Sequence, residues 1–235
     1  MTAALVQNGA RVYIASRKLH DLESVAASMN ETARGGPWPA GTACIPLQAD
    51  LSSKAGCDAL AAELARHTSR LDILVNNAAY QRSYEKFEEI PQGEIETTFK
   101  TNVFPIFYLT QAAAAHLRPG ACVINTSSIQ ALSPTPGLIF YAATKSAISS
   151  MTKSLAGLLA DKGIRVNAVA PGPVWTPLIP STLDPGFVKQ FGSHTAFKRP
   201  AQPVEQATLF VFLASDDASY VTGEVFGATG GQTPI

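Results

Sequence analysis

Residues 125–145 read Asn-Thr-Ser-Ser-Ile-Gln-Ala-Leu-Ser-Pro-Thr-Pro-Gly-Leu-Ile-Phe-Tyr-Ala-Ala-Thr-Lys and join a predicted strand to a predicted helix. The apolar run 121–125 is typical of a buried strand, and the unbroken, Ala-rich run 141–161 is typical of a helix. Tyr141 and Lys145 are four residues apart and therefore share one helical face. Ser128 precedes Tyr141 by thirteen residues, at the end of the strand.

These three side chains form a candidate acid/base set. A phenol with a pKa near ~10 is a poor acid/base catalyst at neutral pH, and a cation one turn away lowers that pKa by favouring phenolate. Ser128 is placed to meet Tyr141 and to donate a hydrogen bond to a substrate carbonyl oxygen. The alternative is that Tyr141 and Lys145 form a surface pair and that the Ser-Ser sequence is a strand-end turn, since such pairs are common on exposed helices.

The surroundings favour the catalytic interpretation. Asn76-Asn77-Ala78-Ala79 upstream and Pro171-Gly172 downstream complete a pattern that resembles the short-chain dehydrogenase/reductase family, from about Gly9 to Gly231. The resemblance implies an α/β fold, a doubly wound, Rossmann-like parallel sheet with helices on both faces. It also implies that Ser128 orients a carbonyl, that Tyr141 gives or takes a proton, and that Lys145 lowers the pKa of Tyr141 and touches the ribose of a nicotinamide cofactor.

Composition restricts the other classes of function. The 235 residues are 46% hydrophobic and 15% charged, with no linker, which indicates one domain (1–235) with a sizeable core. Formal net charge is zero and no basic run occurs, so neither nucleic acid nor an anionic membrane is an expected partner. Cys44, Cys57 and Cys122 lack disulfide or metal-ligand spacing. With no signal peptide and no apolar run of ~18–20 residues, we expect a soluble cytoplasmic protein.

The amino-terminal region departs from the family pattern. Residues 1–8 predict the end of a helix, Gly9 its cap, and residues 11–15 a short buried strand. A dinucleotide-binding unit begins with a strand and a Gly-rich turn, whose backbone N–H groups receive the pyrophosphate, and no such turn precedes Met1. We expect the first strand to be absent, through a truncated gene model or a natural short form. Its absence predicts neighbouring strands without ladder partners and exposed apolar surface.

The resemblance implies cofactor contacts at the ends of the first strands. Ser16 and Arg17 follow the strand at 11–15, where an acidic residue would select NAD and an Arg takes the 2′-phosphate of NADP. The prediction is NADP (NADPH), and the alternative is a solvated basic helix start. Asp50 and Leu51 are expected beside the adenine, although helix capping also explains Asp50. Asn77 is expected beside a ribose.

Other positions complete the expected site. Asn102 lies in the helical run 92–116, and the resemblance implies that it distorts this helix and holds a water in the proton relay; the alternative is an Asn that satisfies backbone groups. Pro171, Gly172, Val174 and Thr176 are expected around the nicotinamide and the phosphates. Residues 177–200 are expected to form a substrate lid, with His194 on its surface. Residues 203–217 resemble the last helix of the family, and residues 220–225 with Gly230-Gly231 resemble its final strand. These stretches build subunit contacts in relatives, so a homodimer or homotetramer is expected.

The leading hypothesis is an NADP-dependent oxidoreductase that interconverts a carbonyl and an alcohol by hydride transfer, similar to the broad aldehyde/ketone and sugar-alcohol reductases. The absent phosphate loop leaves two alternatives open. One is a cofactor-independent enzyme of the same family that catalyses proton transfer, dehydration or cyclisation. The other is a non-catalytic subunit of an oligomer.

Overall fold

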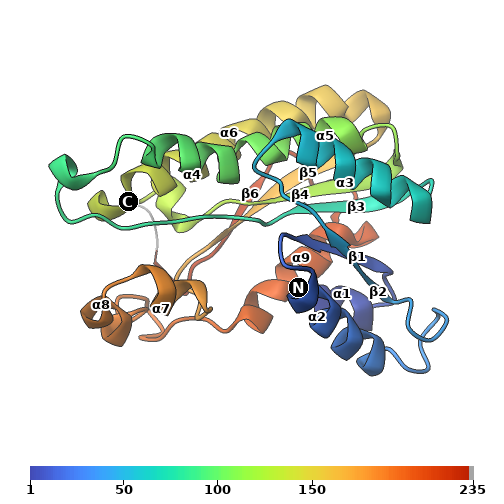
Figure 1. Cartoon of the computed structure of the whole chain (residues 1–235), viewed down its shortest axis with the longest axis horizontal. Helices are drawn as coiled ribbons and strands as arrows, with labels where there is room; N and C mark the ends of the chain where they lie inside the picture. Colours follow the sequence, from blue (N-terminus) through green and yellow to red (C-terminus); the bar gives the residue numbers. More distant parts are fainter. Residues whose placement is uncertain (233–235) are drawn as a thin grey trace.

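The computed structural model describes residues 1–232, and its strands lie in two parallel sheets (Figure 1). The first sheet pairs β1 (Val12–Ser16) with β2 (Cys44–Gln48). The second has the order β3-β4-β5-β6, formed by β3 (Leu71–Asn76), β4 (Leu117–Thr126), β5 (Arg165–Pro171) and β6 (Val225–Ala228). The predicted parallel α/β class is therefore confirmed.

Helices connect successive strands and return the chain, so that the paired strands run in the same direction. They are α2 (Leu19–Thr32), α3 (Lys54–His67), α4 (Glu94–Asn102), α5 (Phe104–Ala113), α6 (Ile139–Leu159), α7 (Leu178–Thr182), α8 (Pro185–Gln190) and α9 (Pro203–Ala214), while the helix α1 (Thr2–Gln7) precedes the first strand. Within residues 1–232, none of these helices has the length and apolar character needed to cross a membrane.

The four-stranded sheet is covered on both faces, as Figure 1 shows. Helices α3, α5 and α6 lie on one face, where Val123 and Val166 are completely buried among Leu60, Leu109 and Leu159. Helix α9 covers the other face. There, its residues Phe210 and Leu213 pack against Cys122, Ile124 and Val169 of β4 and β5. The two apolar faces explain why β4 and β5 are continuous apolar runs.

The strands β1 and β3 are less buried than the sequence predicts. None of the five residues of β1 is fully buried, and Ile73 and Val75 of β3 are only partly buried. The strand predicted at 11–15 is therefore present, but the prediction that it is buried is wrong. The reason is that β1 pairs only with β2, and β3 only with β4, so one edge of each strand has no ladder partner among the described residues.

Two predicted elements have different bounds. The helical run at 92–116 is divided into α4 and α5, because Asn102 ends the first helix and Pro105 occupies the first turn of the second. The final strand lies at Val225–Ala228 instead of 220–225. Tyr220 is fully exposed, and Gly223, with a φ of 80°, turns the chain just before the strand.

Candidate active site

Ser128, Tyr141 and Lys145 come together where β4 meets α6. Ser128 follows the end of β4 and caps a short 3₁₀ turn, its hydroxyl oxygen accepting a 3.2 Å hydrogen bond from the backbone N–H of Gln130. Tyr141 and Lys145 lie one turn apart near the start of α6, and Nζ of Lys145 is 5.4 Å from the centroid of the Tyr141 ring. The Ser128 side chain also lies close enough to the Tyr141 phenol to lower its pKa. The interpretation as a simple surface pair is wrong, because Lys145 is 1% exposed.

The pKa values of Tyr141 and Lys145 differ from those that the sequence predicted. Burial raises the pKa of the Tyr141 phenol, and the nearby Ser128 side chain acts in the opposite direction. Burial also lowers the pKa of Lys145 to about 7. The expected lowering of the Tyr141 pKa by a lysine cation is therefore not what the structure shows. Both groups are removed from water, and desolvation disfavours phenolate and ammonium alike.

Asn102 fixes the segment after β3 against α6. Its Oδ1 accepts a 2.7 Å hydrogen bond from the backbone N–H of Tyr80, and its Nδ2 donates to the Tyr80 carbonyl at 2.8 Å and to Oγ1 of Thr144 at 3.0 Å. Thr144 directly precedes Lys145. The amide of Asn102 thus satisfies backbone groups and ends α4, which is the alternative that the sequence left open, while its part in a proton relay stays a prediction.

Asparagine side chains tie the carboxyl ends of β3 and β4 together. Asn76 donates a 2.9 Å hydrogen bond to Oδ1 of Asn125, its register partner in β4. Oδ1 of Asn77 accepts a 3.0 Å hydrogen bond from the hydroxyl of Thr126. The partly exposed end of this sheet, where ligands bind in parallel α/β folds, is therefore held in one geometry next to Ser128.

The residues expected beside the adenosine part of the cofactor lie at the end of β1 or shortly after β2, the two strands of the first sheet. Ser16 ends β1, and its carbonyl accepts a 2.9 Å hydrogen bond from the N–H of Ala49, while the Arg17 side chain is exposed. Oδ1 of Asp50 accepts from the N–H of Ser52 at 3.0 Å, which lowers the Asp50 pKa.

The capping alternative for Asp50 is wrong, because the N-cap of α3 is Ser53, whose hydroxyl accepts from the N–H of Gly56. Ser16 and Leu51 line the same cavity of about 520 Å³ as Asn77, so the structure brings the two groups of residues to one cleft.

The segment after β5 packs closely against the residues that follow β6. A Cβ atom added to Gly172 would lie 2.7 Å from Cα of Thr229, so only glycine fits. Val174 forms a bridge with Ala201, and the partly exposed Thr176 precedes α7. Pro171 is the last residue of β5, beside Ala228 of β6.

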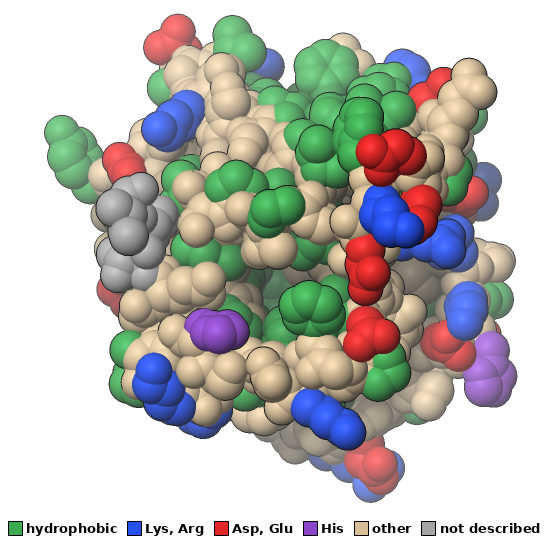
Figure 2. Space-filling model, turned by 90° about the vertical axis from the view of Figure 1, so that its left-hand side faces the viewer, with side chains coloured by type: hydrophobic (Ala, Val, Ile, Leu, Met, Phe, Trp, Pro, Cys, Tyr) green, Lys and Arg blue, Asp and Glu red, His purple; other side chains and the backbone are tan. Residues whose placement is uncertain are grey.

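Helices α7 and α8 follow the segment after β5 along the chain. Oγ1 of Thr182 accepts a 2.9 Å hydrogen bond from Nε2 of Gln81, which ties α7 to the segment that follows β3. Figure 2 shows a hollow in the face that carries α7 and α8, with hydrophobic side chains around its border. His194 is exposed, as expected, and Phe187 and Phe197 are 68% and 72% exposed.

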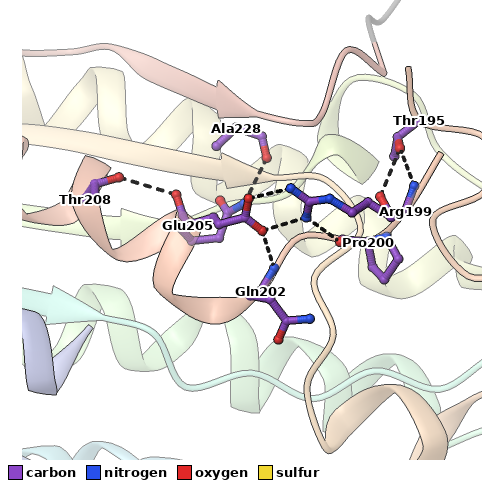
Figure 3. A network of polar contacts seen from close by, with 8 residues as sticks. Thr195, Arg199, Pro200, Gln202, Glu205, Thr208 and Ala228 are labelled. Carbon is purple, nitrogen blue, oxygen red and sulfur yellow. Dashed lines mark hydrogen bonds and ion pairs between the residues drawn. The ribbon is translucent and has the colours of Figure 1, made fainter. Parts of the chain in front are cut away.

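A polar network that the sequence did not predict holds residues 192–202 in place (Figure 3). Arg199 donates two 2.7 Å hydrogen bonds to the carboxylate of Glu205, which also accepts from the backbone N–H of Gln202 at 2.7 Å. These contacts hold the pKa of Glu205 at about 2. Thr195, 1% exposed, donates to the carbonyls of Gly192 and Arg199. The available signal was Glu205 three residues after Gln202, with Pro203 between them, a typical helix start.

Comparisons with known proteins give a consistent result. The sequence matches the family model described as enoyl-(acyl carrier protein) reductase over residues 1–233. The uncharacterized oxidoreductase YhdF of Bacillus subtilis is 47% identical over 189 residues, which are 80% of this chain and 65% of that protein. The glucose and ribitol dehydrogenase of Daucus carota is 46% identical over 187 residues, 80% of this chain and 64% of that protein.

A solved structure is similar over nearly the whole chain. L-sorbose reductase from Gluconobacter frateurii, complexed with NADPH and L-sorbose, has a TM-score of 0.86 at 27% identity, covering 98% of this chain and 90% of that one. The chain spans just under two thirds of the length of the two curated relatives named above.

Proposed function

Because the chain belongs to the short-chain dehydrogenase/reductase family, we propose that it is an NADP-dependent oxidoreductase that interconverts a carbonyl and an alcohol. The observation that carries the proposal is the convergence of Ser128, Tyr141 and Lys145 at the end of β4. The similarity to a sorbose reductase and to a sugar-alcohol dehydrogenase supports a small polar carbonyl compound as substrate.

Each residue of the set has a role that follows from its chemistry. The Ser128 hydroxyl donates a hydrogen bond to the substrate oxygen and holds it beside Tyr141. In the reducing direction the Tyr141 phenol gives its proton to that oxygen, and in the oxidising direction the phenolate takes it back. Lys145, with a pKa of about 7, exists in both protonation states near neutrality and is suited to resupply that proton. A bound nicotinamide supplies or accepts the hydride at the substrate carbon.

The donors around the cleft suit an NADP molecule. The exposed guanidinium of Arg17 matches the 2′-phosphate, and the Asn77 amide, the Thr176 hydroxyl and Lys145 match ribose hydroxyls and phosphates. Ser16, Asp50 and Leu51 border the adenosine end, and Pro171, Gly172 and Val174 form the wall at the nicotinamide end. Asn102, bonded to the neighbour of Lys145, is proposed as a positioning residue of the proton relay. The NADPH bound to the sorbose reductase supports the choice of cofactor.

The wider assignments are also proposals. Residues 1–235 act as one catalytic domain, and residues 177–200 cover the substrate, supported by the bond between Gln81 and Thr182. The protein works as a cytoplasmic homodimer or homotetramer.

The direct test mixes purified protein with NADPH and a panel of aldehydes, ketones and ketoses while the absorbance of the cofactor is followed. We expect turnover with NADPH and a weaker response with NADH. Arg17→Ala should raise KM for NADPH at least tenfold and leave KM for NADH unchanged. Calorimetry without substrate measures cofactor binding separately. Absence of both binding and turnover overturns the proposal.

A further inference from the structure

Residues 80–84 contact both the start of α6 and the helix α7. At one end of this segment, Asn102, which also binds α6, holds the backbone N–H and carbonyl of Tyr80. At the other end, the N–H of Tyr84 donates a 3.0 Å hydrogen bond to the carbonyl of Gly137, just before α6. In Figure 1 the chain that leaves β3 runs between α6 and α7. The segment therefore borders the helix that carries the proposed catalytic residues.

Helix α4 fixes the same segment through a buried carboxylate. Glu94 is 7% exposed, and its Oε2 accepts a 2.8 Å hydrogen bond from the hydroxyl of Tyr84 and a 3.4 Å hydrogen bond from that of Tyr80. Burial and the bond to Glu94 raise the pKa of Tyr84 to about 12, so this phenol remains a donor at neutral pH. The residues between the two tyrosines are thus held in one position.

Gln81 reaches from this segment to α7. Its side chain is 6% exposed, and its Nε2 donates a 2.9 Å hydrogen bond to Oγ1 of Thr182. The Thr182 hydroxyl donates its own proton to the carbonyl of Leu178 at 2.6 Å, so it can only accept from the amide. This fixes the direction of the amide: the NH₂ group faces α7, and Oε1 does not.

Oε1 of Gln81 is an unused acceptor. It accepts no hydrogen bond from residues 1–232. In the part of the chain that the structure describes, the completely buried and unpaired side-chain atoms are the Tyr13 hydroxyl and Oε1 of Gln206, so Oε1 of Gln81 is within reach of solvent or a ligand. A carbonyl oxygen accepts up to two hydrogen bonds, and polar groups removed from bulk water are nearly always paired. Gln81 therefore offers a hydroxyl donor a fixed partner.

We propose that Gln81 selects hydroxylated substrates, its Oε1 accepting a hydrogen bond from a hydroxyl group on the carbon chain of a polyhydroxy ketone or aldehyde. The inference rests on the proposed carbonyl reduction and names the substrate class of the same site. An alkyl ketone displaces water from Oε1 without replacing its hydrogen bond, and such a loss is penalised more than a missing apolar contact. The bond from Nε2 to Thr182 holds the amide in place for this role.

The first test compares erythrulose with butanone, which are four-carbon ketones with and without hydroxyl groups. The absorbance of NADPH gives kcat and KM for each ketone. For the unmodified chain we expect kcat/KM to be about tenfold or more higher for erythrulose. Gln81→Met keeps the length of the side chain and removes the amide, and it should lower this ratio about tenfold, mainly through KM for erythrulose.

Two further variants separate substrate selection from the attachment of α7. Thr182→Val removes the partner of Nε2 and leaves Oε1 in place, so it should slow both ketones by the same factor and keep their ratio. Gln81→Glu keeps an acceptor oxygen and should retain the preference for erythrulose within about threefold. A purely structural role of Gln81 predicts the same ratio in all of these proteins.

Binding without turnover gives an independent readout. Ligand-detected NMR without cofactor compares erythritol with butan-2-ol, alcohols that correspond to the two ketones, and we expect tighter binding of erythritol that Gln81→Met abolishes. If the unmodified chain reduces neither ketone, the proposed function fails, and the NMR comparison still decides the role of Gln81.

Three results overturn the proposal: an unchanged ratio in Gln81→Met, an equal loss of the ratio in Thr182→Val, or erythritol binding no tighter than that of butan-2-ol. If Gln81→Met fails to fold, the two ketones and the two alcohols on the unmodified chain decide the test, since no preference for the hydroxylated compounds also overturns it.

Discussion

The side-chain nitrogen of Lys145 donates a 2.7 Å hydrogen bond to the carbonyl oxygen of Thr126, the last residue of β4. This bond attaches the first turns of α6 to the strand that leads directly into Ser128. The relative position of the lysine, the tyrosine and the serine is therefore set by backbone geometry. The carbonyl of Thr126 provides a polar partner for a lysine that is otherwise removed from water.

Replacing Lys145 by Met should change how stability depends on pH. The ordinary lysine pKa of 10.5 applies to the unfolded chain, whereas burial lowers the folded value to about 7. At a pH between 7 and 10.5, Lys145 is protonated in the unfolded state and neutral in the folded state. The free energy of unfolding therefore rises with pH across this window, on the order of a few kcal/mol, and levels off below about pH 7.

Lys145→Met should remove that slope in urea unfolding measured between pH 7 and 10. Lys153→Met, at an exposed position of the same helix, is the matched control and should retain it. A Lys145→Met protein with the slope of the unmodified chain would contradict the burial of an ionisable lysine.

Tyr141→Phe should lower kcat for carbonyl reduction by about 10²–10⁴-fold, because it removes the proton donor and leaves the ring in place. The absorbance of NADPH gives the rate, and calorimetry should find NADPH affinity unchanged within about threefold. Tyr220→Phe removes the hydroxyl of a fully exposed tyrosine and serves as the control. Similar rates for both variants would exclude Tyr141 as the acid/base residue.

Gly172→Ala and Gly157→Ala should have opposite effects on stability. The added Cβ at position 172 meets the backbone of Thr229 at 2.7 Å, and overpacking of this kind costs about 1–3 kcal/mol. At position 157, inside α6, the added Cβ meets nothing within 4 Å, and the gain in helix stability is about 0.5–1 kcal/mol. Denaturant unfolding measures both changes. A stabilised Gly172→Ala variant would show that the turn after β5 is not tightly packed.

Glu205→Gln should loosen residues 192–202. The substitution removes the charge that pairs with Arg199 through two hydrogen bonds, so we expect faster limited proteolysis in this segment. Glu63→Gln, which weakens the contacts of Glu63 with Arg66 and His67 at the end of α3, is the control and should leave the rate unchanged.

The same network has a defined pH dependence. The folded pKa of Glu205 is about 2, below its ordinary value of 4.5, so its stabilisation is complete above about pH 4.5 and is lost as the pH falls through 2. The proteolysis difference between Glu205→Gln and the unmodified chain should therefore persist from pH 5 to 8, measured with a protease active over that range. A difference that vanishes within this range would contradict the assignment.

Local sequence predicted much of the fold. The helix predicted at 141–161 corresponds closely to α6 (Ile139–Leu159). The pattern from Asn125 to Lys145 also identified the three residues that meet at the end of β4. These features were accessible because helical periodicity and residue spacing depend on neighbours along the chain.

Other features required contacts between distant segments. The bounds of β6, the capping of α3 by Ser53 and the pairing of Arg199 with Glu205 depend on which groups meet in three dimensions. The sequence suggested helix capping only for Asp50, whereas in the structure Ser53, three residues later, caps α3.

The sequence by itself determined the strand and helix segments, the family and the identity of the candidate catalytic side chains, because these depend on residue type and local spacing. Only the tertiary structure decided that burial raises the pKa of Tyr141 and lowers that of Lys145, and that Gln81 meets Thr182 of α7. Desolvation and hydrogen bonding between distant residues both depend on what the rest of the folded chain places beside a group, which spacing along the sequence does not specify.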